Sequence, residues 1–243
     1  SILCYGLRFA KIIPTRKLEF SREIRVMAQR TIHMLFGTLL LDRIELYDKN
    51  RFLLGSILPD AYINPTDRKV AHFIKYVSDE NCLYFDFKDF LERFRNNITN
   101  DDLYLGYYAH LVEDAFYRYF LYYEKGFMEK IKRYELDILH GDYHILNSYI
   151  ARKYPLPSCL ELPKAFENEL LNGITEFDIK KIVDDYEKDI VELHHEKTVL
   201  LTEAMLEEFV FKYTDVLADE LYSVRQGYSK LNVMDYRWEN KRE

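Results

Sequence analysis

Residues that form tight turns are scarce in this sequence, which holds only 8 glycines and 6 prolines in 243 residues. A fold built from many strands and hairpins needs more of both, so sheet-rich architectures are disfavoured. The net charge is −7 and no run rich in Lys and Arg occurs, so the basic surface expected of a protein that binds long nucleic acids is missing. No apolar run approaches the roughly 18 residues of a membrane span, and we expect no transmembrane segment.

Cysteine is also sparse, because Cys4, Cys82 and Cys159 lie far apart and are odd in number. Three scattered cysteines predict no disulfide framework and favour a reducing compartment. We therefore expect a cytoplasmic protein. No feature of the sequence indicates the oligomeric state.

Apolar and aromatic side chains, by contrast, are abundant, with 21 Tyr and 16 Phe, and they recur at helical spacing. This pattern predicts an all-α fold, a bundle of several helices, although Gly55 and Pro59 are expected to interrupt any helix that reaches them. The helices are expected at residues 31–47, 64–74, 86–97 and 102–123, from 126 to about 139, from 140 to before 155, and at 164–173, 175–195 and 198–223.

The helical patterns and the stretches without such patterns divide the chain into four parts. Met27-Ala-Gln-Arg-Thr resembles a native start, which makes the residues before it an extension. We expect an N-terminal extension at 1–27, a helical core that carries the candidate site at 28–157, C-terminal helices packed on that core at 158–226, and a tail at 227–243.

One stretch of the core combines an imidazole with a carboxylate on an otherwise apolar helix. His110 and Asp114 are four residues apart, so on a helix they lie one turn from each other on the same face. Such a pair has two sensible explanations, a satisfied hydrogen bond in the core or two ligands of one metal ion.

Three further residues bear on this choice. His33 enters the interior in the first turn of a helix that is apolar nearly all round, and His72 also has apolar neighbours. Asp60 follows an Ile-Leu-Pro run and either caps the next turn or projects a carboxylate into a buried site. Neutral imidazoles with carboxylates are the ligands that Zn²⁺ prefers. One shared zinc site explains these residues better than three separately satisfied core histidines.

The order of these residues along the chain resembles the zinc-dependent phospholipase C family, whose all-helical fold is shared with single-strand-specific zinc nucleases. The resemblance covers roughly residues 28–150 and lies in the succession His33, Leu-Pro-Asp60, His72-Phe and His110-x-x-x-Asp114. It implies that Asp60, His72, His110 and Asp114 hold one zinc ion. It also implies that His33 and Asp114 hold a neighbouring ion.

The sequence departs from the family at three points. Family members use their mature N-terminal amine and first carbonyl as ligands, which a start at Ser1 or Met27 does not obviously provide. The family's further His, six residues after the bridging Asp, is Phe120 here. Its later His-x-x-x-Glu pair is at best His140-x-x-x-His144 with Asp142 between, so these three are weaker candidate ligands. We expect one zinc ion or a pair rather than three.

The resemblance implies a hydrolase of phosphoester or phosphodiester bonds, in which a metal-activated hydroxide attacks phosphorus between ions about 3.5–4 Å apart. Asp60 is the expected general base. Arg118, one turn after Asp114, either holds a substrate phosphate or pairs with that carboxylate. The substrate is expected to be small, since a phospholipid headgroup, a nucleotide and a small phosphodiester would all fit. The alternative is a non-catalytic helical protein with a structural or degenerate metal site.

Overall fold

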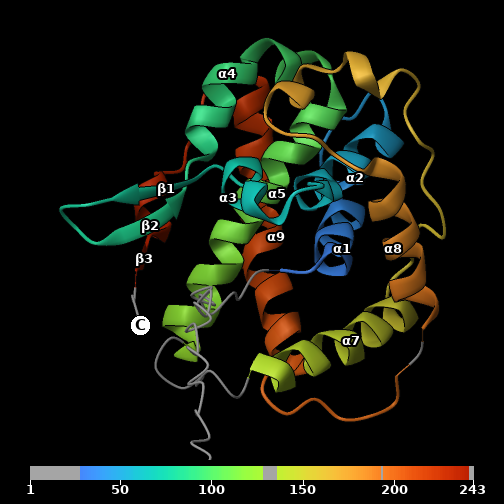
Figure 1. Cartoon of the computed structure of the whole chain (residues 1–243). Coiled ribbons are helices and arrows are strands. Elements are labelled where there is room, and N and C mark those ends of the chain that lie inside the picture. Colours follow the sequence, from blue (N-terminus) through green and yellow to red (C-terminus); the bar gives the residue numbers. More distant parts are fainter. Residues whose placement is uncertain (1–27, 128–135, 193, 241–243) are drawn as a thin grey trace, which may run out of the picture.

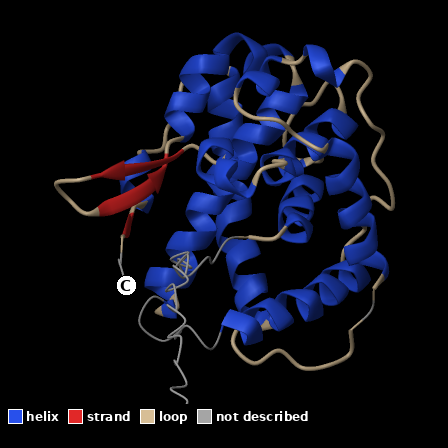
Figure 2. Ribbon diagram, in the orientation of Figure 1, coloured by secondary structure: helices blue, strands red, loops and turns tan. Residues whose placement is uncertain are grey.

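The computed structural model describes residues 28–127, 136–192 and 194–240, and most of them are helical (Figure 2). The expected all-α character is therefore confirmed in outline, with a small three-stranded sheet as an addition. The α-helices are α1 (Arg30–Leu40), α2 (Lys49–Ile57), α3 (Arg68–Ala71), α4 (Phe87–Asn100), α5 (Asp102–Tyr119), α7 (Leu136–Lys153), α8 (Ile179–Val191) and α9 (Glu203–Arg225).

Helix α5 is the centre of the molecule (Figure 1). It begins at an Asp101 cap, whose side chain accepts a hydrogen bond from the Leu103 N–H, and nearly all of its residues are buried. A helix that is apolar on every side must be surrounded by other elements. Helices α1, α2, α4 and α9 all pack against it.

Two glycines allow α2 to approach α5 closely. A Cβ on Gly55 would lie 2.2 Å from the Leu103 carbonyl oxygen, and one on Gly106 would lie 2.1 Å from the Phe52 carbonyl oxygen. Neither position therefore tolerates a side chain without separating the helices. Gly55 does not interrupt α2, which continues to Ile57, and Pro59 lies in the following 3-10 turn, Leu58–Ala61.

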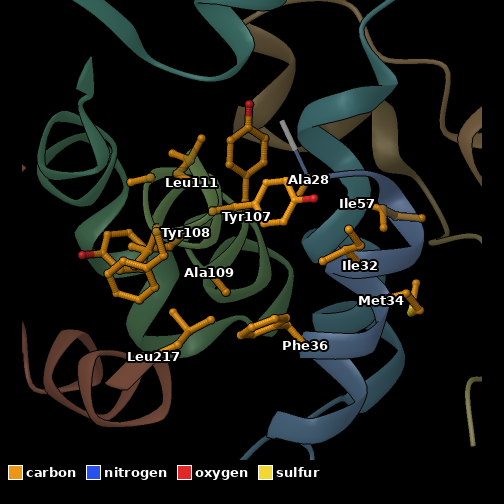
Figure 3. Close-up of a cluster of buried hydrophobic side chains, with 14 of the residues drawn as sticks. Ala28, Ile32, Met34, Phe36, Ile57, Tyr107, Tyr108, Ala109, Leu111 and Leu217 are labelled. Atoms are coloured by element: carbon orange, nitrogen blue, oxygen red, sulfur yellow. The ribbon is translucent and has the colours of Figure 1, made fainter. Parts of the chain in front are cut away.

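Side chains from several helices form one continuous core (Figure 3). Phe36 of α1 and Leu217 of α9 lie near Ala109 of α5, while Ile57 of α2 lies beside Ile32 and Met34 of α1. Helix α8 packs against α7 and α1, and α9 packs against α1, α4 and α5. The N-terminal and C-terminal helices therefore share one core, and the candidate site lies within it.

The sheet lies to one side of the helices (Figure 1). Strands β1 (Ile74–Val77) and β2 (Cys82–Phe85) form an antiparallel hairpin, and β3 (Trp238–Glu239) pairs with β2. The predicted helix over 64–74 is wrong in its second half, because α3 ends at Ala71 and Phe73 has φ 52°. That left-handed conformation turns the chain out of the helix and into β1.

Several boundaries also differ from expectation. Helix α1 ends at Leu40 rather than 47, and the predicted helix 164–173 consists of two 3-10 turns, Phe166–Asn168 and Leu170–Gly173. Helix α8 begins after an Asp178 cap rather than at Thr175. Residues 136–153 form one helix through Gly141, while part of the helix expected at 126–139 lies outside the described residues.

In the described part of the chain, no helix is both long and apolar enough to cross a bilayer, as the sequence led us to expect. Cys82 and Cys159 are free thiols. The predicted extension 1–27, which includes Cys4, lies outside the described residues.

Candidate metal centre

Three imidazoles from different elements meet beside the middle of α5. His33 comes from the first turn of α1, His110 comes from α5, and His72 is the residue directly after α3. The His33 and His110 rings stack with centroids 3.7 Å apart, and the His72 and His110 centroids lie 5.1 Å apart. All three side chains are fully buried.

Two carboxylates complete the cluster. Asp114 lies one turn after His110 on α5 and is fully buried, whereas the side chain of Asp60, in the 3-10 turn after α2, is 23% exposed. Asp60 is thus the member of the cluster that reaches solvent. The structure brings together all five residues that the sequence nominated as principal ligands, while metal binding itself stays a prediction.

Each imidazole has its Nδ1 atom fixed by an oxygen. His33 Nδ1 lies 3.0 Å from Glu113 Oε2, His72 Nδ1 lies 2.9 Å from the Arg68 carbonyl, and His110 Nδ1 lies 2.7 Å from the Ser56 carbonyl. Carbonyl and carboxylate oxygens only accept hydrogen bonds, so the hydrogen belongs to Nδ1 in all three rings. The neutral form of each ring then presents the lone pair of Nε2.

These Nε2 atoms face the two carboxylates at the spacing of metal ligands. His72 Nε2 lies 3.2 Å from Asp60 Oδ1 and 3.7 Å from Asp114 Oδ2, and His110 Nε2 lies 3.4 Å from the same Asp114 oxygen. Ligands that surround Zn²⁺ tetrahedrally at about 2.0–2.1 Å are roughly 3.3 Å from one another. Two overlapping groups of three have ligand atoms close enough to share an ion: His72, His110 and Asp114 form one, and His33, Asp60 and His110 form the other.

Three atoms at the centre have no hydrogen-bond partner in the described part of the chain, although they are completely buried: His33 Nε2, His110 Nε2 and Asp114 Oδ2. When the rings are neutral and carry their hydrogen on Nδ1, all three atoms are acceptors and cannot satisfy one another. Leaving buried polar atoms unpaired costs about 1–3 kcal/mol each. Divalent cations in the cluster would satisfy these atoms, and the mixed imidazole and carboxylate donors suit zinc.

Charges in the cluster reinforce one another. Burial disfavours ionisation of Asp60 and Asp114, yet hydrogen bonding and the positive potential of the imidazoles hold the pKa of both carboxyls below the usual range. Burial likewise opposes protonation of His33, but Glu113, Asp114 and Asp60 outweigh it and raise the pKa of His33 to about 9. Without a metal His33 is therefore protonated at neutral pH, and a bound cation would take the place of the hydrogen on Nε2. Burial lowers the pKa of His72. The centre is therefore strongly attractive to a cation.

Glu113 is a member of this environment that the sequence did not reveal. It is buried, and burial raises its pKa. Only its place next to Asp114 could have drawn attention to it, because its burial depends on packing that the sequence does not report. A glutamate that no water reaches needs a partner. The neighbouring Asp114 is also held by the main chain, because its Oδ1 atom accepts a hydrogen bond from the Ala28 N–H at 3.3 Å.

The weaker candidate ligands lie outside this cluster. His140 and His144 are exposed on α7, and both oxygens of Asp142 accept hydrogen bonds from the N–H groups of residues 199–201 at 2.6–2.8 Å. Among the described residues, the groups able to hold a metal draw only on the five principal candidates. Asp142 instead fixes the loop before α9.

Arg118 also differs from expectation. Its guanidinium lies over the Trp238 ring, 4.1 Å from the centroid, with Phe85 and Tyr122 at 5.5 and 5.4 Å. The favoured ion pair with Asp114 is not among the contacts of the described residues, because the side chain turns away to this aromatic group. Arg118 joins the sheet to α5 through cation–π contacts.

The centre thus combines a closed set of imidazole and carboxylate donors with one partly exposed carboxylate. Comparison with known proteins finds no family model, no curated protein and no solved structure that matches this chain.

Proposed function

We propose that the protein is a zinc-dependent hydrolase of phosphoester or phosphodiester bonds, similar to phospholipase C. The observation that carries the proposal is the convergence of His33 Nε2, His110 Nε2 and Asp114 Oδ2, all buried and unpartnered. Buried polar atoms that point at one another without hydrogens between them indicate a cation site.

The assignment of ligands follows the resemblance in chain order. Asp60, His72, His110 and Asp114 would hold one ion, and His33 with Asp114 would hold its neighbour. The distance of 3.7 Å between His33 Nε2 and Asp114 Oδ1 is compatible with this second position. The chain order of these residues and the helical fold support the zinc-dependent phospholipase C and zinc nuclease type of architecture.

Asp60 is the residue proposed to act on substrate. When bound, zinc would polarise a phosphoryl oxygen and lower the pKa of water at the site. Asp60 Oδ1 faces His72 and the side chain is partly exposed, so its other oxygen would be the atom to take a proton from the attacking water. His33, His72 and His110 are held by their Nδ1 atoms and would keep the centre rigid during this step.

The substrate is proposed to be small. Only Asp60 among the five residues is exposed, and the acidic balance of the chain disfavours long nucleic acids. A phospholipid headgroup, a nucleotide and a small phosphodiester share the phosphate that the centre would bind. The cytoplasmic location expected from the scattered cysteines also remains a prediction.

One observation favours a second candidate, a structural metal site in a non-catalytic protein. Structural zinc sites are closed by four protein ligands, whereas catalytic sites keep one position open. Here four side chains suffice for one ion, and all but Asp60 are buried. In that case Asp60 would only complete the coordination.

Metal analysis and turnover separate the two candidates. Purified protein should contain one or two zinc ions, and it should hydrolyse bis-p-nitrophenyl phosphate in a reaction that a chelator stops and added zinc restores. Bound zinc without turnover would favour the structural site. Protein that takes up no zinc, even after dialysis against the metal, would contradict both.

A further inference from the structure

We infer that Glu113 is a positioning residue for the second metal ion, which it serves by holding His33 in the orientation that ligation requires. The inference rests on the proposed function. It concerns the ion between His33 and Asp114, and it makes occupancy of that position depend on one side chain outside the ligand set.

The three imidazoles differ in what holds them. The Nδ1 atoms of His72 and His110 donate to main-chain carbonyls, those of Arg68 and Ser56, at 2.9 and 2.7 Å. His33 Nδ1 instead donates to a side chain, Glu113 Oε2, at 3.0 Å. A carboxylate on the far nitrogen fixes the tautomer of a ligating histidine and raises its basicity. His33 is therefore the imidazole whose orientation a substitution can release.

Adjacent residues of α5 hold both ends of the His33 ring. Glu113 accepts the hydrogen bond from His33 Nδ1, while Oδ1 of the next residue, Asp114, lies 3.7 Å from His33 Nε2. Both carboxylates are buried, so neither can exchange its partner for solvent. Because the two side chains project from one stretch of helix, the distance between them is fixed by the backbone. The ring of His33 is thus clamped with its lone pair toward the centre.

The two proposed ion positions are consequently unequal. One draws on four side chains whose histidines are held by the main chain, and the other draws on His33 and a shared Asp114. Fewer protein ligands give a weaker site. The centre should therefore bind zinc in two steps, a tight first ion and a weaker second ion that responds to Glu113.

The experiment is a zinc titration of the full metal-free chain against a chromophoric chelator, repeated with Co²⁺ to follow the absorption bands of each bound ion. Loss of an outer carboxylate on a ligating histidine costs about 10–100-fold in metal affinity. Glu113→Ala should weaken the second ion by that factor and leave the first unchanged. Glu113→Gln keeps an acceptor oxygen without its charge, so its effect should be smaller.

Glu220→Gln is the matched control. Glu220 is an equally buried glutamate on α9 that accepts from the Tyr108 hydroxyl at 2.6 Å and from the Lys230 N–H at 2.9 Å. Its replacement should lower the thermal midpoint without changing either affinity. His33→Ala should lose the second ion, and adding Glu113→Ala to it should cause no further loss if Glu113 acts through His33.

The outcomes are distinct. Unchanged second-ion affinity in both Glu113 variants would overturn the inference, as would equal weakening of both ions or a single ion in the wild-type protein. The last result would leave the proposed function standing, whereas a wild-type chain that binds no zinc would remove both. If Glu113→Ala does not fold, Glu113→Gln and the His33 pair decide the question.

Discussion

Asp114 and Asp142 are two buried aspartates on long helices, and their surroundings differ completely. Both oxygens of Asp142 accept main-chain N–H groups, three in all, from residues 199–201. Asp114 accepts one N–H on Oδ1, while Oδ2 faces two imidazole nitrogens that carry no hydrogen when the rings are neutral. The first carboxylate is satisfied by the fold, and the second needs a positive charge, which a metal ion would supply.

The comparison separates stability from ligand binding. A carboxylate with three donors contributes to folding through charge-assisted hydrogen bonds, and both of its oxygens already have partners. A carboxylate that meets lone pairs is costly to the folded chain until a positive charge arrives. Removing the charge from Asp114 should therefore abolish metal binding, whereas removing it from Asp142 should lower the stability of the fold.

Asp114→Asn should give the largest effect. The asparagine can still accept the Ala28 N–H, so the fold should persist, but the charge shared by both ions is gone. Zinc content should fall below one per chain. Loss of several kcal/mol of electrostatic stabilisation should lower kcat/KM for bis-p-nitrophenyl phosphate by at least about 1000-fold. A variant that keeps its zinc would erase the distinction between Asp114 and Asp142.

Asp60→Asn should have the next largest effect. It compares the two carboxylates of the centre, because Asp60 is proposed to act as the base as well as a ligand. Three ligands remain for the first ion, so most of the zinc should stay. Loss of a general base lowers the rate by about 100–10,000-fold, and we expect this in kcat rather than in KM. Full loss of zinc with Asp60→Asn would make this residue a ligand alone and favour the structural site.

Asp142→Asn should act on stability instead. The amide has one acceptor oxygen in place of two, and its NH₂ group would face donors. Hydrogen bonds to charged groups contribute about 1.5–3 kcal/mol each, so the free energy of unfolding should fall by about 2–3 kcal/mol. For a chain of this size that shifts the thermal midpoint by roughly 5–10 °C. Zinc stoichiometry should not change, and a loss of zinc would return Asp142 to the ligand set.

Arg118→Met should have the smallest effect. Methionine fills part of the space over Trp238 without the charge, and cation–π contacts contribute about 0.5–2 kcal/mol. We expect a modest loss of stability in chemical denaturation and a kcat/KM within about twofold of wild type. A selective rise in KM would instead place Arg118 on the substrate, which is one of the two roles that the sequence left open.

Local patterns identified the residues of the centre but not all of their roles. The cap at Asp101 and the helical spacing of His110 and Asp114 can be recognised in short stretches of sequence. The structure confirms both, because α5 begins at the Asp101 cap and contains His110 and Asp114. Arg118 was expected to pair with Asp114 one turn away. Its actual partner, Trp238, is 120 residues distant, and no local pattern reports such a contact.

Burial is the other quantity that spacing does not supply. Glutamate is a residue type usually found on the solvated face of a helix, and only the packing of α1 against α5 reveals that Glu113 is buried beside His33. The sheet also depends on a contact between distant residues, because β2 pairs with β3 from the far end of the chain. Gly55 was expected to end a helix, yet its lack of a side chain permits the close crossing of α2 and α5.

The most direct test is a crystal of the zinc-loaded protein with anomalous data on both sides of the zinc absorption edge. We predict a strong peak within bonding distance of His72 Nε2, His110 Nε2 and the carboxylates of Asp60 and Asp114. Zinc found only elsewhere, for example on the exposed histidines of α7, would contradict the assignment of this cluster as a metal centre.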